Sequence, residues 1–303
     1  MKSSISVVIL TYNEELNIAK CLESVKNWAD EIIIVDSYST DKTLVIAEKY
    51  GAEVVQHPFK NQADQFNWAL DNVEIKNEWI LRLDADEYLT EELKKEISFS
   101  LNPLTPRFSG LRFRLGFGKK EISSSTEVNG YYIKRRVYFM GRWIKHGGYY
   151  PSWFLRLFRK GKARYEEREM DEHVVLLSGE SAKLKNDFID DNQKNLYWWT
   201  EKHNDFSNRE TNERFKEMAR LEEQKKLKGK LVGSQAERKR WIKQGFYFKL
   251  PLFWRAFAYF IYRYIFRLGF LDGKEGLIFH FLQGCWHQFL IDAKMYEKIK
   301  NKL

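Results

Sequence analysis

Two aspartates stand two residues apart at the end of an apolar run. The run is WILRLDADEYL, residues 79–89, and the aspartates are Asp84 and Asp86. Side chains two apart in an extended strand lie on the same face. Two carboxylates held side by side repel each other unless a positive charge lies between them. Carboxylates suit Mg²⁺ or Mn²⁺, which commonly bridge one or two of them to substrate phosphates. The pair therefore indicates a metal–diphosphate site, with a solvated strand end as the alternative.

Other polar groups follow two earlier apolar runs. The segment TYNE, residues 11–14, follows the run at 5–10, and Asp36 ends the run at 31–36. The cluster STD at residues 39–41 is typical of a helix cap, and Asn13 can be a cap as well. Capping does not account for Asp36, which we interpret as a ligand contact. The functional interpretation of residues 11–14 is a pocket for a nucleobase or ribose.

A third acidic group surrounds one histidine in YEEREMDEHVV, residues 165–175. Chemistry at a sugar hydroxyl needs a base, and a carboxylate can act as one. A histidine can be a metal ligand. A salt-bridged surface strand would give the same pattern, so the residues alone leave both interpretations open.

The elements that must position these groups alternate between strand and helix. The β-rich runs are residues 5–10, 31–36, 52–57 and 78–84, and the helix-like segments between them are 14–28, 39–51 and 61–73. The strands are continuously apolar, which is typical of a parallel sheet covered on both faces. Ligands of such sheets bind at the carboxyl ends of the strands. The sequence therefore predicts an α/β fold in which the polar groups meet at one edge.

Charge is distributed unevenly along the 303 residues. Residues 1–100 hold 10 Lys and Arg against 19 Asp and Glu, although the whole chain has a net charge of +9. The rest of the chain therefore carries +18. Such a basic and aromatic part favours an anionic partner: a membrane surface, a nucleic acid or a phosphorylated acceptor. The only cysteines, Cys21 and Cys285, form no disulfide framework and favour a reducing compartment.

The short apolar run at the N-terminus predicts a buried strand rather than a signal peptide, and no apolar run in the sequence is long enough to predict a spanning helix. A helix starting at Pro251 would place Arg255, Arg263 and Arg267 in one sector, with aromatic and aliphatic residues over much of the rest. This pattern is typical of a helix lying on an anionic membrane. Packing against its own domain or a second subunit is the alternative.

Six segments in a fixed order carry a resemblance to a known family. They are ISVVILTYNEE, IIIVDSYSTDKT, QFNWAL, WILRLDADE, HGGYYPSWFLRLFRKGK and MDEHV. In this order they resemble family 2 glycosyltransferases, most of all the bacterial lipopolysaccharide-core and capsule glucosyltransferases. The resemblance spans residues 1–180, and RLGFLDGKEGL is similar to the end of that subgroup.

The resemblance implies a GT-A fold, a nucleotide-sugar donor such as a UDP-hexose, a divalent cation (Mn or Mg) and inversion at the anomeric carbon. The catalytic domain would be residues 1–185, with a nucleotide-sugar half at 1–100 and an acceptor half at 101–185. Residues 186–303 would form a helical, basic and aromatic extension.

The resemblance also implies site residues. The nucleotide-sugar would be bound by Thr11, Asn13, Glu14, Asp36, Asn67, Asp84 and Arg156. The cation would be held by Asp86, with Asp84 and His173 assisting.

The base would be Asp171 or Glu172. Many relatives have His-Glu at these two positions, which favours Glu172. Phe66 stands where relatives often carry Lys or Arg. One phosphate-facing charge is therefore either absent from this chain or supplied from elsewhere, with Arg82 and Arg156 as the candidates.

The function predicted from these features is an inverting transfer of a sugar to a lipid-linked saccharide acceptor, in lipopolysaccharide, capsule or exopolysaccharide synthesis. The enzyme would be cytoplasmic and peripheral on the anionic inner face of the cytoplasmic membrane. A nucleotidyltransferase also uses paired aspartates, but it usually carries a Gly- and Arg-rich loop where this chain has TYNEELN. A basic protein that binds a membrane or nucleic acid without catalysis is the other alternative; the acidic N-terminal third argues against nucleic acid.

Overall fold

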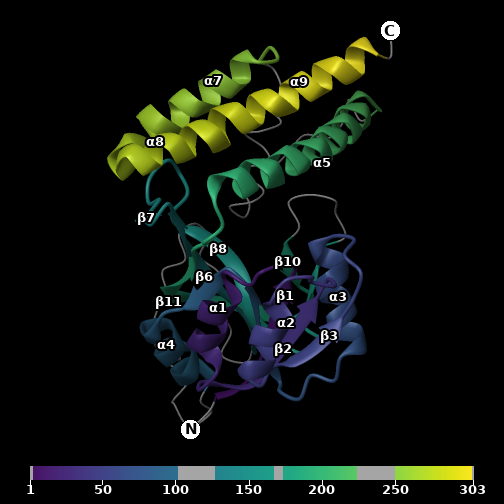
Figure 1. Cartoon of the computed structure of the whole chain (residues 1–303), viewed down its shortest axis with the longest axis vertical. Coiled ribbons are helices and arrows are strands. Elements are labelled where there is room, and N and C mark those ends of the chain that lie inside the picture. The colour runs from purple at the N-terminus through teal and green to yellow at the C-terminus, as the bar shows by residue number, and fades with distance from the viewer. Residues whose placement is uncertain (1–2, 102–126, 167–172, 224–249, 302–303) are drawn as a thin grey trace. The chain divides into compact units, whose positions relative to one another are not determined.

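The computed structural model describes residues 3–101, 127–166, 173–223 and 250–301. The chain divides into two compact units, and each is described by itself (Figure 1). The first consists of residues 1–138 and 150–193, and the second of residues 139–149 and 194–303.

The first unit contains a large mixed sheet. Its strand order is β3-β2-β1-β4-β8-β6-β11-β5. The four strands from β3 to β4 are parallel, β8 is antiparallel to both β4 and β6, and β11 is parallel to β6. The strands are β1 (Ser3–Thr11), β2 (Ala29–Asp36), β3 (Glu53–Gln56), β4 (Trp79–Asp84), β5 (Glu87–Leu89), β6 (Val128–Phe139), β8 (Ser152–Arg159) and β11 (Glu180–Asp190). The α/β fold predicted from alternating strands and helices is confirmed.

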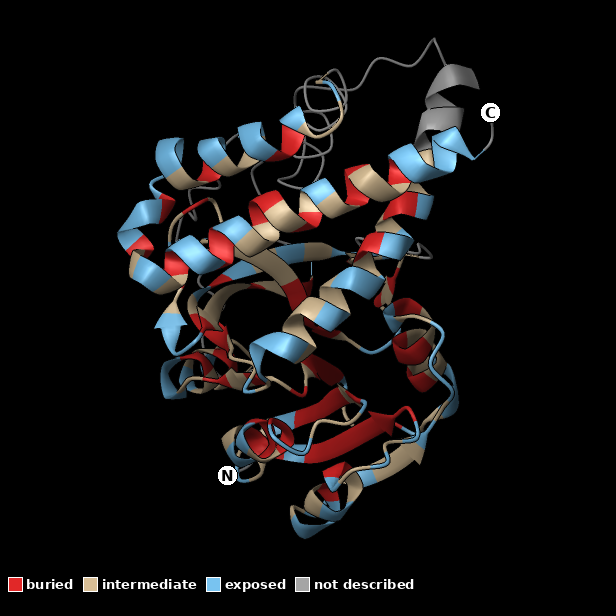
Figure 2. Cartoon of the chain, turned by 45° about the horizontal axis from the view of Figure 1, so that its top comes forward, coloured by how far each residue is buried: buried red, intermediate tan, exposed pale blue. Residues whose placement is uncertain are grey.

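Helices cover both faces of this sheet. On one face, α1 (Ile18–Val25), α2 (Thr43–Lys49) and α4 (Glu91–Leu101) pack on Val7 and Ile9 of β1. On the other face, α3 (Gln62–Asn72), β9 (Ala163–Tyr165) and β10 (Val174–Leu176) pack on Val8. Both faces of a central strand are thus buried, as the red strands in Figure 2 show. This explains why the strands are continuously apolar.

Strand register brings the polar groups to one edge. In the parallel β1–β2 pair, Thr11 lies opposite Asp36. In the parallel β1–β4 pair, Leu10 lies opposite Asp84. The carboxyl ends of three neighbouring strands therefore meet where the sequence predicts a ligand.

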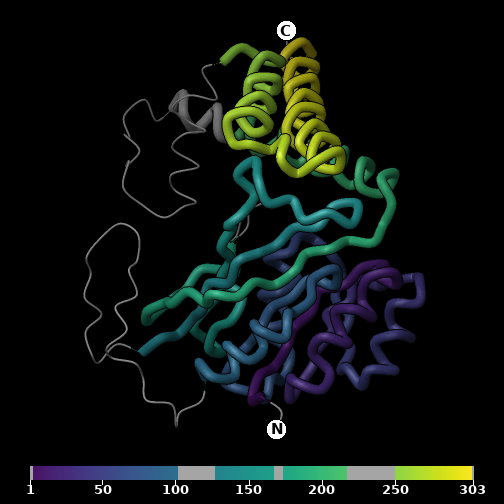
Figure 3. Tube along the Cα trace, turned by 90° about the vertical axis from the view of Figure 1, so that its left-hand side faces the viewer, coloured from purple at the N-terminus to yellow at the C-terminus, as the bar shows by residue number. Residues whose placement is uncertain are grey.

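The second unit is mainly helical. Helices α7 and α9 run side by side (Figures 1 and 3), and α5 packs along α9. A π-helical turn follows both α7 and α8. The elements are β7 (Arg142–Trp143), α5 (Leu196–Glu223), α7 (Trp254–Ile261), η2 (Tyr262–Phe266), η3 (Gly269–Asp272), α8 (Gly273–Phe281), η4 (Leu282–Trp286) and α9 (His287–Lys300).

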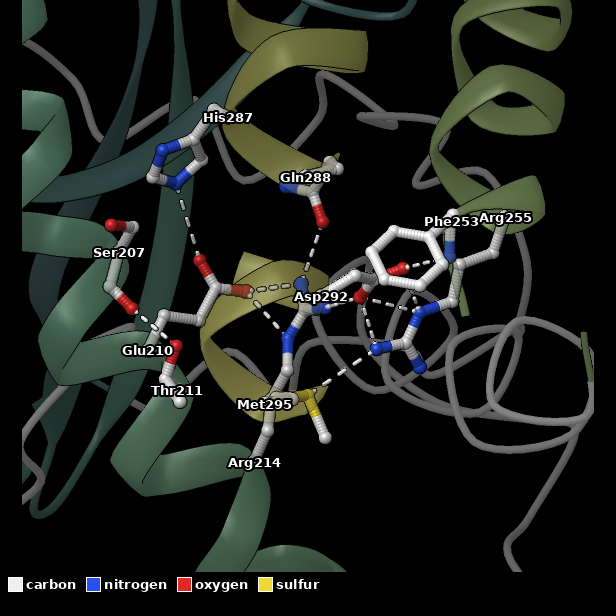
Figure 4. Close-up of polar contacts among 10 residues, drawn as sticks. All are labelled: Ser207, Glu210, Thr211, Arg214, Phe253, Arg255, His287, Gln288, Asp292 and Met295. Atoms are coloured by element: carbon white, nitrogen blue, oxygen red, sulfur yellow. Dashed lines mark hydrogen bonds and ion pairs between the residues drawn. The ribbon is translucent and has the colours of Figure 1, made fainter. Parts of the chain in front are cut away.

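A buried polar network joins α5, α7 and α9 (Figure 4). Arg255 Nε donates to both carboxylate oxygens of Asp292 at 2.8 Å. Arg214 Nη2 donates to Glu210 Oε1 and Gln288 Oε1, each at 2.6 Å. Buried charges are tolerated when they are paired in this way. The network fixes how the three helices pack.

The arginines of α7 and η2 correct one prediction. Arg255 is buried against Asp292, and the buried Arg263 donates through Nε to the Gly147 carbonyl at 3.0 Å. Arg267 is exposed. The expectation of a basic stripe facing lipid is therefore wrong for Arg255 and Arg263, because their partners lie far away in sequence and helical periodicity cannot reveal them.

The outward face of this helical region is aromatic and aliphatic instead. Its exposed apolar side chains are Trp254, Phe257, Ile261, Tyr262, Ile265, Phe266, Leu268, Phe270, Leu271, Leu277, Ile278 and Phe281. Of the helices within the described ranges, none has both the length and the apolar character needed to cross a membrane.

Candidate active site

Asp36 organises the first part of the sheet edge. Its carboxylate is fully buried and accepts hydrogen bonds from Thr11 Oγ1 at 2.9 Å, the Ser39 backbone N–H at 2.8 Å and Gln56 Nε2 at 3.1 Å. Buried carboxylates need such donors. Asp36 therefore positions Thr11 and the start of the loop after β2.

The segment after β1 is braced against the segment after β2. Asn13, in the left-handed region with φ 52°, accepts a hydrogen bond from the Thr40 N–H at 2.8 Å and donates its own N–H to Ser39 Oγ at 2.8 Å. The Glu14 N–H donates to Thr43 Oγ1 at 2.7 Å. These bonds hold the predicted nucleoside-binding residues in one wall.

The expected helix cap is only partly correct. Asp41 Oδ1 accepts the Thr43 N–H at 2.9 Å, at the first residue of α2. Ser39 instead binds Asp36 and Asn13, and the Thr40 N–H binds Asn13. Ser39 and Thr40, which the sequence pattern assigned to a helix cap, instead connect the loop after β2 to the segment after β1.

Asp84 lies in a cluster of buried charges. It forms ion pairs with Arg82 and with Arg156, whose Nη2 is 3.5 Å from Asp84 Oδ2. Arg156 Nη2 also contacts Glu87 Oε1 at 2.5 Å, and the Asp84 N–H donates to Glu87 Oε2 at 2.9 Å. Arg82, Arg156 and Glu87 are buried. Two guanidinium groups therefore compensate the acidic charge here.

Asp86 does not share an extended strand with Asp84. Strand β4 ends at Asp84, and Ala85 and Asp86 form a turn before β5 begins at Glu87. The same-face argument from strand alternation is therefore wrong, because the chain reverses between the two aspartates. Asp86 Oδ2 accepts from Asn192 Nδ2 at 2.8 Å. In the described part of the chain, no three His, Cys, Asp or Glu residues are grouped to hold a metal ion.

The charge cluster shifts two pKa values. Burial, and then the negative charge of Asp84, raise the pKa of Glu87 well above its usual range. Burial lowers the pKa of Arg82, but the charge of Asp84 and neighbouring groups outweighs this and raises it overall. Arg82 thus remains cationic, and its positive charge partly offsets the rise in the pKa of Glu87.

The predicted base segment is anchored at both ends. Asn67 pairs with the backbone of Tyr165, donating to its carbonyl at 3.2 Å and accepting its N–H at 3.0 Å. The Glu166 N–H donates to the His173 carbonyl at 3.0 Å. Asp171 and Glu172 lie outside the described residues. Asn67 and His173 therefore lie at the base of the segment that carries both candidate bases.

Phe66 is a core residue. It is fully buried and lies edge-on to Phe158 and Tyr165, with ring centroids 6.1 and 5.6 Å away. Arg82 lies over the same Tyr165 ring, 5.3 Å from its centroid. Arg82, one of the two arginines expected to replace the charge, therefore lies close to the contact between Phe66 and Tyr165.

Sequence reasoning missed Glu87 and Asn192. Glu87 is the third acidic residue of the DADE sequence at residues 84–87, so the sequence does mark it as a candidate. Asn192 reaches Asp86 from 106 residues away, and nothing in the local sequence marks it.

The comparisons with known proteins agree with this geometry. The family described as Glycosyl transferase family 2 matches residues 6–162, just over half of the chain and all of the edge described above up to Arg156. The chain belongs to glycosyltransferase family 2.

Among relatives of this family 2 chain, the lipopolysaccharide core biosynthesis glycosyltransferase LpsC of Rhizobium meliloti is 31% identical over 57% of this chain and 58% of its own length. An uncharacterized glycosyltransferase of Rickettsia bellii is 48% identical over 33% of each chain. The chain thus spans about a third of the length of the rickettsial relatives it matches. The structure of Staphylococcus aureus TarS 1–349 in complex with UDP-GlcNAc is 16% identical, with a TM-score of 0.44 over 98% of this chain and 92% of that one.

Proposed function

We propose that this family 2 chain is an inverting glycosyltransferase that transfers a hexose from a UDP-sugar to a hydroxyl of a lipid-linked saccharide. The observation that carries the proposal is the meeting of Asp36, Asp84 and two buried arginines at one sheet edge. The hydrogen-bonded segments after β1 and β2, together with the charge cluster, suit a nucleoside diphosphate. LpsC supports the pathway, because its name assigns it to lipopolysaccharide core synthesis.

The nucleoside would bind against the wall formed by Thr11, Asn13, Glu14 and Asp36. The diphosphate would lie toward Arg82 and Arg156. Within the described residues, Arg82 Nε and Arg156 Nη1 have no hydrogen-bond partner. Fixed cations near a leaving diphosphate lower the barrier because they stabilise the charge that develops on it. Since ion pairs with Asp84 and Glu87 hold the two buried guanidinium groups, they need little reorganisation when the sugar is transferred.

The donor set near Asp86 fits a divalent cation. Asp86 is half-buried in a turn, and Oδ1 accepts no hydrogen bond from a described residue, while Asn192 orients Oδ2. One or two carboxylates suffice for Mg²⁺ or Mn²⁺ when substrate phosphates complete the shell. Asp86 would hold the ion, with Asp84 and His173 as further candidates. When bound, the ion neutralises charge on the leaving diphosphate.

Proton transfer is assigned to Glu172, with Asp171 as the alternative. A sugar hydroxyl is a weak nucleophile until a base removes its proton. Direct attack of that hydroxyl on the anomeric carbon inverts its configuration and releases the diphosphate. Asn67 supports this assignment, because it ties the backbone of Tyr165, six residues before Asp171, to α3.

The second unit supports a lipid-linked acceptor and a peripheral location on the inner face of the cytoplasmic membrane. Its α7–α8 region exposes a dozen large apolar side chains. Residues 194–303 hold 23 Lys and Arg against 12 Asp and Glu, a balance of +11. Apolar exposure combined with positive charge is typical of proteins that bind anionic bilayers.

The experiment that tests the donor assignment is a thermal-shift panel of nucleotide-sugars with and without Mn²⁺. A ligand that binds only the native state raises the melting temperature by mass action. We expect a UDP-hexose to stabilise the protein in the presence of Mn²⁺ and Asp86→Asn to lose the Mn²⁺-dependent part.

Asp71→Asn is the matched control, because Asp71 is an exposed aspartate paired with Arg164 away from the edge. Stabilisation of Asp86→Asn equal to that of the wild type would contradict the metal assignment. Failure of every nucleotide-sugar would contradict the donor assignment.

A further inference from the structure

A second charged surface lies on the sheet, outside the donor site. It consists of Lys134 and Arg136 on β6, Trp153 on β8, and Lys183 and Asp187 on β11. Lys134 lies opposite Trp153 in the β6–β8 pair and opposite Asp187 in the β6–β11 pair. Cross-strand neighbours project from the same face. These five side chains, called here the β6–β8–β11 surface, therefore gather from three strands.

Strand alternation shows on which face of the sheet the β6–β8–β11 surface lies and toward which edge it extends. Tyr132 and Leu155, also opposite each other, pack in the apolar cluster beneath α3 and β9. Lys134 and Trp153 lie two residues further along, so they share that face. Because β8 is antiparallel to β4, the step from Leu155 to Trp153 leads toward the carboxyl end of β4. The surface thus continues the face on which β9 lies, toward the edge that holds Asp84.

Asp187 is the buried centre of this surface. Lys134 Nζ is 3.0 Å and Arg136 Nε 2.6 Å from its carboxylate, and Tyr150 Oη donates to it at 3.1 Å. The carboxylate orients both cations. Lys183 adds a third cation, which is exposed and has no carboxylate partner among the residues described. Three positive charges against one negative charge leave a surplus that attracts an anion.

Trp153 lies beside two of these cations. Lys183 Nζ is 4.6 Å and Lys134 Nζ is 5.6 Å from the centre of its indole ring. An indole offers a flat apolar face that a sugar ring can cover, and its polar N–H suits a wet site. A structural ion pair alone would need neither the exposed Lys183 nor a half-buried tryptophan beside it.

We propose that the β6–β8–β11 surface binds the acceptor and selects a saccharide that carries a negative charge. The sugar ring would pack on Trp153, and a phosphate or carboxylate substituent would pair with Lys183 and Lys134. This rests on the proposed glycosyltransferase function. It deepens that function, because it names the acceptor chemistry and places acceptor recognition on the face that carries both ends of the predicted base segment, Tyr165 and Val174.

The test uses the full chain with UDP and Mn²⁺ at saturation, so that charged sugars do not enter the donor site. Binding of glucose 6-phosphate, glucuronate and methyl glucoside is measured by saturation-transfer NMR. We expect at least one charged sugar to bind about fivefold or more tightly than the neutral one, since exposed ion pairs contribute up to about 1 kcal/mol each. The phosphate and carboxylate arms show which anion is preferred.

Lys183→Gln is expected to remove most of this preference for a charged sugar. Trp153→Ala is expected to weaken the binding of all three sugars. Lys185→Gln is the matched control, because Lys185 is an exposed lysine on the same strand. In a turnover assay, Lys183→Gln should raise the acceptor KM, and Lys185→Gln should not.

Equal binding of charged and neutral sugars, or unchanged binding in Lys183→Gln and Trp153→Ala, would overturn the proposal. A thermal shift with UDP and Mn²⁺, measured first, separates this result from failure of the donor assignment. If UDP stabilises the protein and no sugar binds preferentially, the acceptor proposal alone is wrong.

Discussion

At the residue scale, the site depends on charges that compensate one another. Arg156 bridges Asp84 and Glu87; Arg156 and Glu87 are buried, and Asp84 is half-buried. Removing one partner of a buried pair leaves an uncompensated charge, which costs more than the pair itself contributes. Arg156 is therefore expected to support both folding and donor binding.

Replacing Arg156 by Met tests this dependence. We expect a loss of about 3–5 kcal/mol in the free energy of unfolding at pH 8. The pKa of Glu87 is already raised by burial and by Asp84, and we expect it to rise further without the Arg156 guanidinium, which contacts Glu87 Oε1 at 2.5 Å. A carboxyl group that binds its proton more tightly when folded loses stability as pH rises through that pKa. Urea unfolding of Arg156→Met should therefore show higher stability at pH 5.5 than at pH 8.

The double variant Arg156→Met/Glu87→Gln should lose most of this pH dependence, because the titrating group is gone. Arg164→Met removes an exposed ion pair with Asp71 and should change stability by about 0.5 kcal/mol or less. If Arg156→Met lowers the free energy of unfolding equally at both pH values, packing rather than the charge of Glu87 determines the stability of this variant.

Sequence alone predicted which residues end the strands, because strand ends follow from apolar runs and turn residues. It did not predict how those residues are used. The Asp36 carboxylate accepts hydrogen bonds from Thr11, Ser39 and Gln56. The positive group beside Asp84 is the guanidinium of Arg82. Such pairings depend on register across strands, which local patterns do not contain.

At the element scale, the loop at residues 139–149 is held by the α7–α8 region of the second unit. The Gly147 N–H donates to the Arg267 carbonyl at 2.9 Å, and the His146 N–H to Asp272 Oδ2 at 2.9 Å. His280, fully buried, packs against Gly147. The HGG sequence was recognised only by resemblance, and its physical role is this close approach of backbone to imidazole.

Gly147→Ala tests that approach. A Cβ at this position would overlap the His280 ring, and the backbone φ of +66° already disfavours a side chain. Overpacking a tight contact typically costs about 1–3 kcal/mol. Gly141→Ala is the control, because it has a similar φ of +76° in the same loop with nothing within 4 Å of the added Cβ.

We expect Gly147→Ala to unfold at a lower urea concentration than Gly141→Ala. The free energy of unfolding should be lower by about 1–3 kcal/mol. Equal stability of the two variants would mean that backbone strain alone matters and that His280 can move aside.

At the scale of the whole molecule, the two units differ in charge and in the kind of surface they expose. The acidic residues of the first 100 positions lie in the unit that carries the proposed donor site, and the second unit is basic and exposes apolar side chains on its helices. Helical periodicity identified the amphipathic stretch after Pro251 but assigned two of its arginines, Arg255 and Arg263, to the wrong surroundings. Membrane attachment, as proposed, therefore depends mainly on aromatic insertion, with charge contributed by the unit as a whole.

Liposome co-sedimentation tests this division of roles. We expect the protein to pellet with phosphatidylglycerol-containing vesicles and much less with neutral phosphatidylcholine vesicles. Trp254 and Phe266 are 71% and 72% exposed, so replacing them by Ser should leave the fold unchanged. Each replacement should weaken vesicle binding by roughly tenfold, as expected for the partial burial of a large aromatic side chain.

Phe99→Ser is the matched control, because Phe99 is a 56% exposed aromatic residue on α4 of the first unit. It should bind vesicles like the wild type. If Trp254→Ser and Phe266→Ser also bind like the wild type while salt releases all the proteins equally, attachment is electrostatic. The apolar face would then be left to a protein partner, such as a second copy of the chain, and the apparent mass of Phe266→Ser in solution would be lower than that of the wild type.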